Sequence, residues 1–522
     1  MPISAHPVPR RAVLASAAAT AAVAALSGCD SSDGPSGGAS GGTLTAGFDN
    51  EPTTLDPALS SAISSDRNVL NLFFDSLLRQ RRDGTLAPAL AVKWTVTDKE
   101  IIFELRTGVT FHDGTPFDAE AVVTNLKRIS DPVTRSTKTA ALASVAEVKA
   151  TSARTVVLTL KSADPLLLTQ LAHEPGMMAS LAALSKSGKD FGRRPVGTGP
   201  FTFRQWRSKV QLSAERNKTY WDKDKDGTPL PRLEKVVLRF VTEAKVLRAE
   251  LLTGGVQLVR ALPPEEYKQL ADDKRITVKD EGVRRNYYAS LNVTKGPFRD
   301  PRVRAAFAMA IDRGAVGKAS AGGDFDLAPS FATSRDWFYD GSLALLPHDP
   351  EKARATLEKA GLRGPVPLTL LARRRAPDPT VAELLQSQLT AAGFAPKVEV
   401  LEFQTQLERM KRHDFDAAVL VVDVPRLDPS LSFDPYFAST GPSNWSGLDD
   451  PALDALLDKG LSTDDRAVRK QAYVDVQRRI LQNNYWVFLH QAKSPLIHSG
   501  RLKGLELDVD GQWRLERARL GA

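Results

Sequence analysis

Few residues of this chain combine a reactive side chain with the spacing that catalysis requires. The seven histidines are scattered, and none belongs to an H-E-x-x-H pattern or pairs with a serine and an acid as a triad would. Two G-x-S-x-G matches occur at 34–38 and 38–42, but the flanking sequence has neither the strand nor the helix of a nucleophile elbow. We therefore predict no catalytic residue, no cofactor and no enzymatic activity, with a secreted hydrolase as a remote alternative.

One stretch has half of a metal-binding pattern. Residues 222–227, DKDKDG, carry the alternating aspartates and the glycine of the first half of a calcium loop. The twelfth position, where such a loop needs a bidentate glutamate, is Leu233, and Glu234 comes one residue late. Pro229 and Pro231 also stiffen the second half of the loop. We expect a solvated turn, with a calcium loop as the alternative, and we predict no directly ligated metal.

The secondary-structure signals alternate between strands and helices. Residues 94–97 and 101–105 predict a hairpin, and Asp118 predicts the N-cap of a helix whose buried face includes Val122, Leu126 and Ile129. Further strands are expected at 43–48, 155–160, 233–241, 256–258, 368–372, 397–401, 416–422 and 485–490. Further helices are expected at 66–79, 165–171, 243–252, 301–313, 349–361, 381–392 and 466–482. The alternation in the second half predicts an α/β lobe.

The bulk properties describe a large globular protein. A chain of 522 residues is too long for one ordinary core, so two or three domains are expected. Removing Arg10 and Arg11 of the N-terminal segment from the net charge of +8 leaves +6, and the remaining charges are interspersed. No basic stripe with interleaved aromatic residues occurs, so a nucleic-acid partner is not expected. A single cysteine, Cys29, excludes an internal disulfide and a paired-thiolate zinc site.

The N-terminal residues have the layout of an export signal. Arg10 and Arg11 precede an apolar, alanine-rich segment at 12–26, and residues 26–29, LSGC, resemble a bacterial lipobox. We therefore predict a signal peptide at 1–28 and lipidation of Cys29, which would anchor the protein to the outer face of the cytoplasmic membrane. The two arginines leave Sec and twin-arginine export both open. Serine and glycine dominate 29–42, which predicts a flexible tether.

Several stretches together resemble one protein family. They are FELR at 103–106, GVTFHDGTPF at 108–117, PVGTGPF at 195–201, NKTYW at 217–221, PFRDPRVRAAFAMAIDR at 297–313 and DPEKARATLEKAG at 349–361. This chain is similar to the family 5 extracytoplasmic solute-binding proteins, the peptide- and nickel-binding subunits of ABC importers. Long motifs with fixed internal spacing make the resemblance specific.

The resemblance implies a fold and a division into domains. It implies an α/β, two-lobed periplasmic-binding-protein-like fold (type II, large cluster C form) with an extra subdomain in the first lobe. Lobe I is expected at 43–66, 195–285 and 489–522, the extra subdomain at 67–194, and lobe II at 286–488.

The resemblance also implies ligand-binding residues in an interlobe cleft. In peptide-binding members, an aspartate at the position of Asp423 pairs with the α-ammonium group of the ligand. Here the tryptophan expected three residues earlier is Leu420, and the loop that leads to Asp428 is longer. Arg426 could bind a carboxylate or be a surface residue, and Trp445 could stack on a ligand or fill a core.

The loop before the first helix of lobe I reaches the cleft in the family. This nominates Ser64, Ser65 and Asp66, although Asp66 would also serve as a plain helix N-cap.

The predicted function is therefore the binding of a solute without a chemical reaction. We expect a monomeric lipoprotein that binds a small solute, most specifically a di- or oligopeptide, and presents it to an ABC permease in the membrane. A non-peptide ligand such as a nickel chelate or a sugar is the alternative, and a sensing or adhesion role without transport also stays open.

Overall fold

The structure is a computed structural model that describes residues 41–60, 63–281, 284–423, 428–463 and 465–521. The chain divides into two compact units, 1–39 and 40–522, and all described residues lie in the second. The predictions for the signal peptide, for Cys29 and for most of the tether thus fall outside the described residues. Within the described ranges we find no helix that combines the length and the apolar character needed to cross a membrane.

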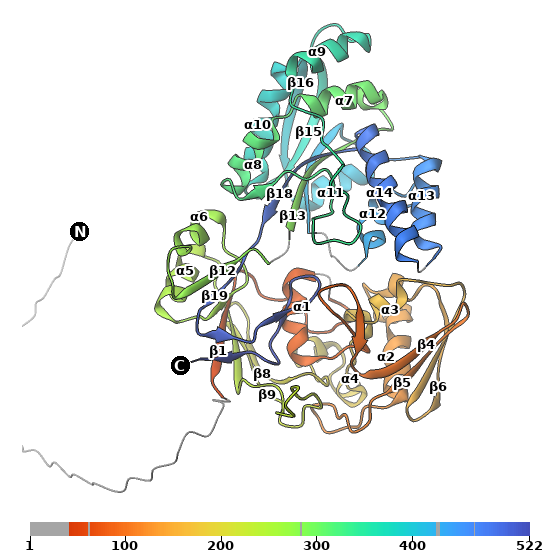
Figure 1. Cartoon of the computed structure of the whole chain (residues 1–522), viewed down its shortest axis with the longest axis vertical. Helices are drawn as coiled ribbons and strands as arrows, with labels where there is room; N and C mark the ends of the chain where they lie inside the picture. Colours follow the sequence, from red (N-terminus) through yellow and green to blue (C-terminus); the bar gives the residue numbers. More distant parts are fainter. Residues whose placement is uncertain (1–40, 61–62, 282–283, 424–427, 464, 522) are drawn as a thin grey trace, which may run out of the picture. The chain divides into compact units, whose positions relative to one another are not determined.

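A seven-stranded mixed sheet forms the centre of what we call lobe I (Figure 1). Its strands, in spatial order, are β12 (Ile276–Lys279), β19 (Leu496–Ser499), β11 (Leu258–Val259), β1 (Thr43–Phe48), β10 (Lys235–Phe240), β9 (Gln211–Arg216) and β8 (Phe201–Arg207). The helices of lobe I are α1 (Ile63–Phe73), α5 (Ala244–Thr253) and α6 (Pro264–Tyr267). The predicted strand at 43–48 is confirmed as β1, which lies inside the sheet between parallel neighbours.

Both faces of β1 are covered, which explains its apolar and small residues. Leu44, Ala46 and Phe48 are fully buried in one core with residues of α1. On the other face, Gly47 leaves room for Leu247 of α5, because a Cβ there would lie 2.1 Å from a Leu247 methyl carbon.

A separate four-stranded antiparallel sheet carries the 89–128 stretch. Its order is β4 (Ala91–Val96), β5 (Glu100–Leu105), β7 (Thr155–Leu160) and β6 (Val145–Ser152), and α2 (Ala119–Ser130) covers it. The predicted hairpin and helix are confirmed. The Asp118 carboxylate accepts a hydrogen bond from the Ala121 amide at 2.9 Å, so Asp118 is the N-cap of α2.

A six-stranded sheet forms the centre of lobe II. Its order is β14 (Phe325–Asp326), β18 (Trp486–Lys493), β13 (Arg284–Leu291), β17 (Ala417–Asp423), β15 (Val366–Arg373) and β16 (Phe394–Leu401). Its helices are α7 (Pro301–Met309), α8 (Arg313–Ala321), α9 (Pro350–Lys359), α10 (Asp378–Ala391), α11 (Phe403–Lys411), α12 (Pro429–Phe437), α13 (Pro451–Leu461) and α14 (Arg466–Asn483). Figure 1 shows α8–α10 on one side of this sheet and α12–α14 on the other.

The alternation of side chains along the strands divides lobe II into two cores. Tyr287 and Ala289 pack with α7–α10, whereas Tyr288 between them packs with α12–α14. A sheet buried on both faces favours near-continuous apolar strands, and β17, with the sequence AAVLVVD, is such a strand. The predicted α/β character of the second half of the chain is confirmed.

The chain crosses between lobes I and II twice, and paired antiparallel strands flank the crossings in each lobe. In lobe I, β12 pairs with β19, and Lys279 lies opposite Leu496. In lobe II, β13 pairs with β18, and Arg284 lies opposite Lys493. The outgoing and the returning chain are therefore neighbours on both sides of the crossing.

Short elements complete the fold. The strands are β2 (Leu78–Gln80), β3 (Leu86–Pro88), β20 (Leu502–Lys503), β21 (Glu506–Leu507), β22 (Trp513–Arg514) and β23 (Arg519–Leu520), and the helices are α3 (Leu167–Gln170) and α4 (Leu181–Ser187). The 3-10 helices lie at Pro132–Thr134, Thr139–Leu142, Glu174–Gly176, Gly188–Arg193, Lys268–Leu270 and Pro297–Arg299.

The predicted helix at 66–79 is wrong in extent. α1 begins at Ile63 and ends at Phe73, and Leu78 already belongs to β2. Just beyond the helix end, the Asp75 carboxylate accepts hydrogen bonds from Tyr220 and Trp221 at 2.9 and 2.8 Å. In the sequence, Leu77 continues the helical spacing of apolar residues beyond the end of α1. In the structure, its side chain is buried in a different core, that of the neighbouring subdomain.

The glycine-rich stretch at 195–201 passes close to the backbone at the end of α1. A Cβ on Gly197 would lie 2.1 Å from the Phe73 carbonyl oxygen, and one on Gly199 would lie 2.4 Å from the Phe73 carbonyl carbon. His112 binds the same stretch: its Nε2 donates to the Gly199 carbonyl at 2.9 Å, and its Nδ1 accepts from the Gly197 amide at 3.4 Å. The His112 motif therefore has a structural role, because it holds the backbone at 197–199 in place.

Candidate functional site

The lobe II side of the candidate site begins at the end of β17. Asp423 is the last residue of that strand and lies opposite Arg285 of β13. Leu420, which stands where a tryptophan was expected, is buried opposite Tyr288. The side chain of Asp423 and all of Arg426 lie outside the described residues.

Aromatic side chains cluster beside this strand end. Tyr436 of α12 makes edge-to-face contacts with Trp445 and Trp486, with ring centroids 6.2 and 5.2 Å apart. Tyr288 stacks on Trp486 at 3.7 Å. Trp445 packs against the lobe II core but is only partly buried, and its carbonyl lies 3.1 Å from Nδ1 of His413. It therefore has a core contact and a remaining accessible surface.

The lobe I side begins at α1. Asp66 is fully buried, and its carboxylate accepts hydrogen bonds from the Thr53 hydroxyl at 2.8 Å and from the Ser60 hydroxyl at 3.0 Å. It lies in the first turn of α1 and ties this helix to residues 53–60. Ser64 and Ser65 belong to α1, but their side chains are outside the described part of the chain.

Arg67, one residue further along α1, is the centre of a buried charge network. Its Nε and Nη2 donate to Glu174 at 2.8 and 2.7 Å, and its Nη1 donates to Asp510. Burial alone would raise the pKa of Glu174, but the attraction of Arg67 outweighs it and lowers that pKa to about 2. Burial and the neighbouring Asp510 raise the pKa of Asp508 to about 7. Sequence reasoning missed this network, because its members are far apart in the chain.

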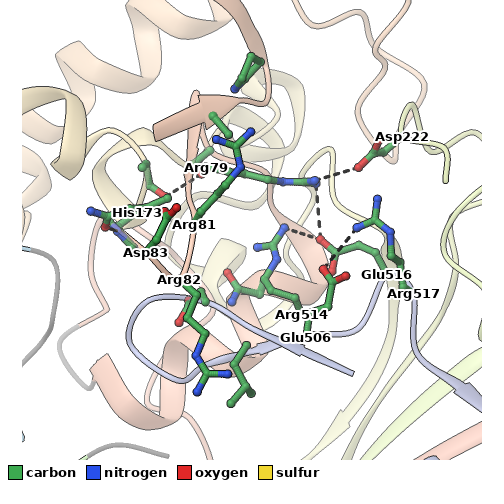
Figure 2. A pocket seen from close by; sticks show the side chains of 18 of the residues that line it. Arg79, Arg81, Arg82, Asp83, His173, Asp222, Glu506, Arg514, Glu516 and Arg517 are labelled. Atoms are coloured by element: carbon green, nitrogen blue, oxygen red, sulfur yellow. Dashed lines mark hydrogen bonds and ion pairs between the residues drawn. The ribbon is translucent and has the colours of Figure 1, made fainter. Parts of the chain in front are cut away.

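A cavity of about 900 Å³ adjoins this network in lobe I (Figure 2). It lies between β2–β3, the segment around His173 and the C-terminal residues 505–517. The basic residues that line it are Arg79, Arg81, Arg82, Lys225, Arg514 and Arg517, and the acidic ones are Asp83, Asp222, Glu281, Glu506, Asp508 and Glu516. The lining is therefore zwitterionic and has no net excess of either charge.

Most of these charges are paired with one another. Arg79 binds Asp222 at 2.8 Å and approaches Glu516 at 3.5 Å, and Arg517 lies 3.3 Å from Glu506 (Figure 2). Among the residues that the structure describes, Arg81 and Lys225 make no ion pair. These two cations are available to a ligand without the loss of an existing pair.

In the turn at 222–227, where a calcium loop was the alternative to a solvated turn, the aspartate carboxylates bind arginines. Arg232 binds the Asp224 carboxylate at 2.6 Å, and Arg517 lies 3.2 Å from it, while Asp222 is held by Arg79. No group of three or more His, Cys, Asp and Glu side chains in the described ranges has the arrangement of a metal site. The turn thus serves as an anchor for arginines from three parts of lobe I.

The histidines near these sites are buried and neutral. His173 lines the cavity, and its Nε2 lies 3.0 Å from the Gln80 amide oxygen. Burial and repulsion from Arg67 lower the pKa of His173 to about 3, and burial lowers the pKa of His112 and of His490 to about 4.

These histidines predict a loss of stability in acid. Each has a folded-state pKa below the unfolded value of about 6.5, so its contribution is present above pH 6.5 and is lost as the pH falls towards 4. Protonation of the imidazole in the unfolded chain alone costs the folded state about 2.5 kcal/mol per histidine at pH 4.5. We expect the urea midpoint of His173→Gln to fall less between pH 7 and 4.5 than that of the wild type. His348→Gln, on the surface, is the control, and an equal pH dependence of all three proteins would contradict the assignment.

Comparison with known proteins agrees with this architecture. Residues 85–444 match the family model of the bacterial extracellular solute-binding proteins, family 5, middle region. The glutathione-binding protein GsiB of Escherichia coli O6:K15:H31 (strain 536 / UPEC) is 30% identical over 490 residues, which cover 90% of this chain and 92% of GsiB.

Solved structures match over the same length. HbpA2 from Haemophilus parasuis superposes with a TM-score of 0.82 at 22% identity, covering 92% of this chain and 100% of HbpA2. The ABC transporter-associated periplasmic binding protein DppA from Helicobacter pylori, in complex with the peptide STSA, has a TM-score of 0.77 at 23% identity and covers 91% and 98% of the two chains.

The fold, with two α/β lobes between which the chain crosses twice and a subdomain attached to the first, is that of the type II periplasmic binding proteins. Its family is equally clear. The chain belongs to the bacterial extracellular solute-binding proteins of family 5. The family resemblance and the fold class drawn from the sequence are confirmed.

Proposed function

We propose that this protein captures a di- or oligopeptide between its lobes and delivers it to the permease of an ABC importer. The observation that carries this proposal is the 30% identity to a glutathione-binding protein over 90% of the chain, since glutathione is a peptide. The complex of DppA with the peptide STSA adds support at the level of the fold.

The side chains near the candidate site suit a zwitterionic ligand. A peptide needs an anion for its ammonium group and a cation for its carboxylate. We propose Asp423 for the first role and Arg426 for the second, with Trp445 stacking on the ligand. Ser65 would contact the ligand from lobe I. Asp66 would hold the adjoining loop in place through its bonds to Thr53 and Ser60.

A non-peptide solute is the second candidate, and one observation favours it. Leu420 fills the place of the family tryptophan and is buried in the lobe II core, so it presents no aromatic face beside Asp423. A smaller or less extended ligand would fit such a site better than a long peptide.

The remaining sequence predictions complete the proposal. Lipidation of Cys29 would hold the protein at the outer face of the membrane, and residues 29–42 would give it reach towards the permease. We propose lobe I at 43–66, 195–285 and 489–522, the extra subdomain at 67–194 and lobe II at 286–488. We further propose that the protein acts as a monomer.

Thermal shift of the full chain tests the ligand class. Di- to tetrapeptides, glutathione, nickel–histidine and sugars are screened, because a ligand at a hundredfold excess over Kd stabilises the folded state by about 2.7 kcal/mol. We expect a peptide to bind and Asp423→Ala to weaken it about 30-fold in calorimetry, through loss of a charge-assisted contact. Asp449→Ala, an exposed aspartate of lobe II, should leave Kd unchanged.

The other results have distinct meanings. Binding of nickel–histidine or a sugar, with no peptide bound, would keep the solute-binding function and overturn the peptide assignment. Peptide binding that is equally strong in Asp423→Ala would overturn the role of Asp423 alone.

A further inference from the structure

Lobe II contains a second cavity that the proposed function does not use. It has a volume of about 290 Å³ and lies between the segment 342–346, the C-terminal end of α14 and the start of β18. Its size is at the lower end of the range of small-molecule sites. Its apolar lining includes Leu343, Leu345, Leu346, Leu481 and Trp486.

One buried cation, Arg313, lines this cavity beside its apolar residues and the polar residues Ser342, Arg478, Gln482 and Asn484. Arg313, the first residue of α8, is only 6% exposed. Its Nε donates to the Phe488 carbonyl at 2.8 Å, and its Nη1 donates to the Leu346 carbonyl at 2.9 Å. In the described part of the chain it has no carboxylate partner, and no hydrogen bond of its Nη2 is found. A buried guanidinium with neutral acceptors alone is incompletely compensated.

Three other buried arginines of this protein each bind a carboxylate. Arg67 binds Glu174, Arg284 binds Asp280 and Arg469 binds Asp428. Arg478, the second basic residue of the cavity wall, is likewise occupied by Asp475 at 2.5 Å. Arg313 therefore stands out as a buried charge that lacks an anion and faces a cavity.

Burial lowers the pKa of Arg313 to about 10, with no contribution from a nearby carboxylate. The group stays positively charged at neutral pH. A ligand that supplies a carboxylate would find a planar donor already held in place by two hydrogen bonds, which favours a charge-assisted contact.

We propose that this cavity binds a small amphiphilic carboxylate, with its anionic head on Arg313 and its hydrocarbon body against the leucines and Trp486. The site shares no lining residue with the lobe I cavity, and only Trp486 also belongs to the aromatic cluster near the end of β17. It would therefore be a ligand site of lobe II in addition to the proposed peptide site.

Calorimetry of the full chain with octanoate tests the proposal, and octanamide serves as the neutral probe of equal length. We expect octanoate to bind with one site per chain, and octanamide to bind at least tenfold more weakly. Equal affinity for the two probes, or no octanoate binding at millimolar concentration, would overturn the proposal.

Two variants of buried arginines test whether octanoate binds in this cavity. Arg304 is 5% exposed and also donates only to carbonyls, those of Asn483, Phe298 and Arg299, but it does not line the cavity. Arg313→Gln should weaken octanoate at least tenfold, whereas Arg304→Gln should change Kd less than threefold. Equal effects of the two changes would mean that a buried arginine matters only for folding, which would refute the site.

A change on the cavity wall tests the proposal without touching the buried charge. Leu343 is only partly buried, so Leu343→Asp should fold and should place a competing carboxylate at the mouth of the cavity. Octanoate binding should be lost, while Leu327→Asp, at a leucine that is 54% exposed elsewhere in lobe II, should leave it intact. Retained binding in Leu343→Asp would contradict the proposal.

Discussion

Replacing Arg67 with methionine is expected to destabilise the protein by about 3–5 kcal/mol. Arg67 is 3% exposed and binds Glu174 and Asp510, which are equally buried. Methionine fills a similar volume but leaves two carboxylates buried without their counter-charge. The loss should appear as a lower urea midpoint, measured by tryptophan fluorescence, and Arg82→Met is the control. Arg82 makes an exposed pair with Glu281, and such pairs contribute at most about 1 kcal/mol.

The effect of Arg67→Met should depend on pH. In the wild type, the lowered pKa of Glu174 contributes stability that is present above about pH 4.5 and is lost as the pH falls towards 2. Without Arg67, burial raises the pKa of the same carboxyl, so the folded variant takes up a proton at higher pH. The difference between variant and wild type should therefore shrink from pH 7 to pH 4.5. A difference that is constant over this range would show that lost packing is the cause.

Gly199→Ala is expected to cost about 3 kcal/mol, at the upper end of the range for overpacking. The added Cβ would lie 2.4 Å from the Phe73 carbonyl carbon and 2.6 Å from the Phe74 amide nitrogen. Both are backbone atoms at the end of α1, and they cannot move without shifting the helix. His112 would also lose its hold on the Gly199 carbonyl. Thermal denaturation would measure the effect.

Gly255→Ala is the matched control for this change. Its Cβ would meet only the side chain and the carbonyl of Glu250, at 3.4 Å or more. We expect a change within about 0.5 kcal/mol, because the backbone there is not constrained. Equal losses in the two variants would attribute the effect to glycine itself and not to the contact with α1.

Local patterns predicted the elements whose signals lie within one segment. Asp118 caps α2, and Asp300 and Asp349 cap α7 and α9, in each of the last two cases with a proline at the first helical position. The β17 strand ends at Asp423, as its apolar run predicted to within one residue. The family motifs then placed these elements in a fold, which periodicity alone could not do.

Features that depend on distant partners could not be predicted in this way. The predicted helix at 66–79 is longer than α1, which ends at Phe73. Leu77 has the spacing of the apolar face of α1 but packs in another core. Arg67 lies in a stretch that reads as an ordinary amphipathic helix, and its partners are 107 and 443 residues away. Of the predicted ligand-binding residues, Asp66 is fully buried and Trp445 is partly buried, whereas Arg426 lies outside the described residues. The predicted lipid-attachment residue, Cys29, also lies outside them.

The two crossings between the lobes let the lobes reorient without loss of sheet pairing. The ladder that includes Lys279 and Leu496 lies wholly in lobe I, and the ladder that includes Arg284 and Lys493 lies wholly in lobe II. A movement of one lobe against the other therefore leaves both registers unchanged and breaks no ladder hydrogen bond. The free-energy difference between an open and a closed arrangement is then set by the contacts between the lobes and with the solute, because the sheets contribute equally to both arrangements.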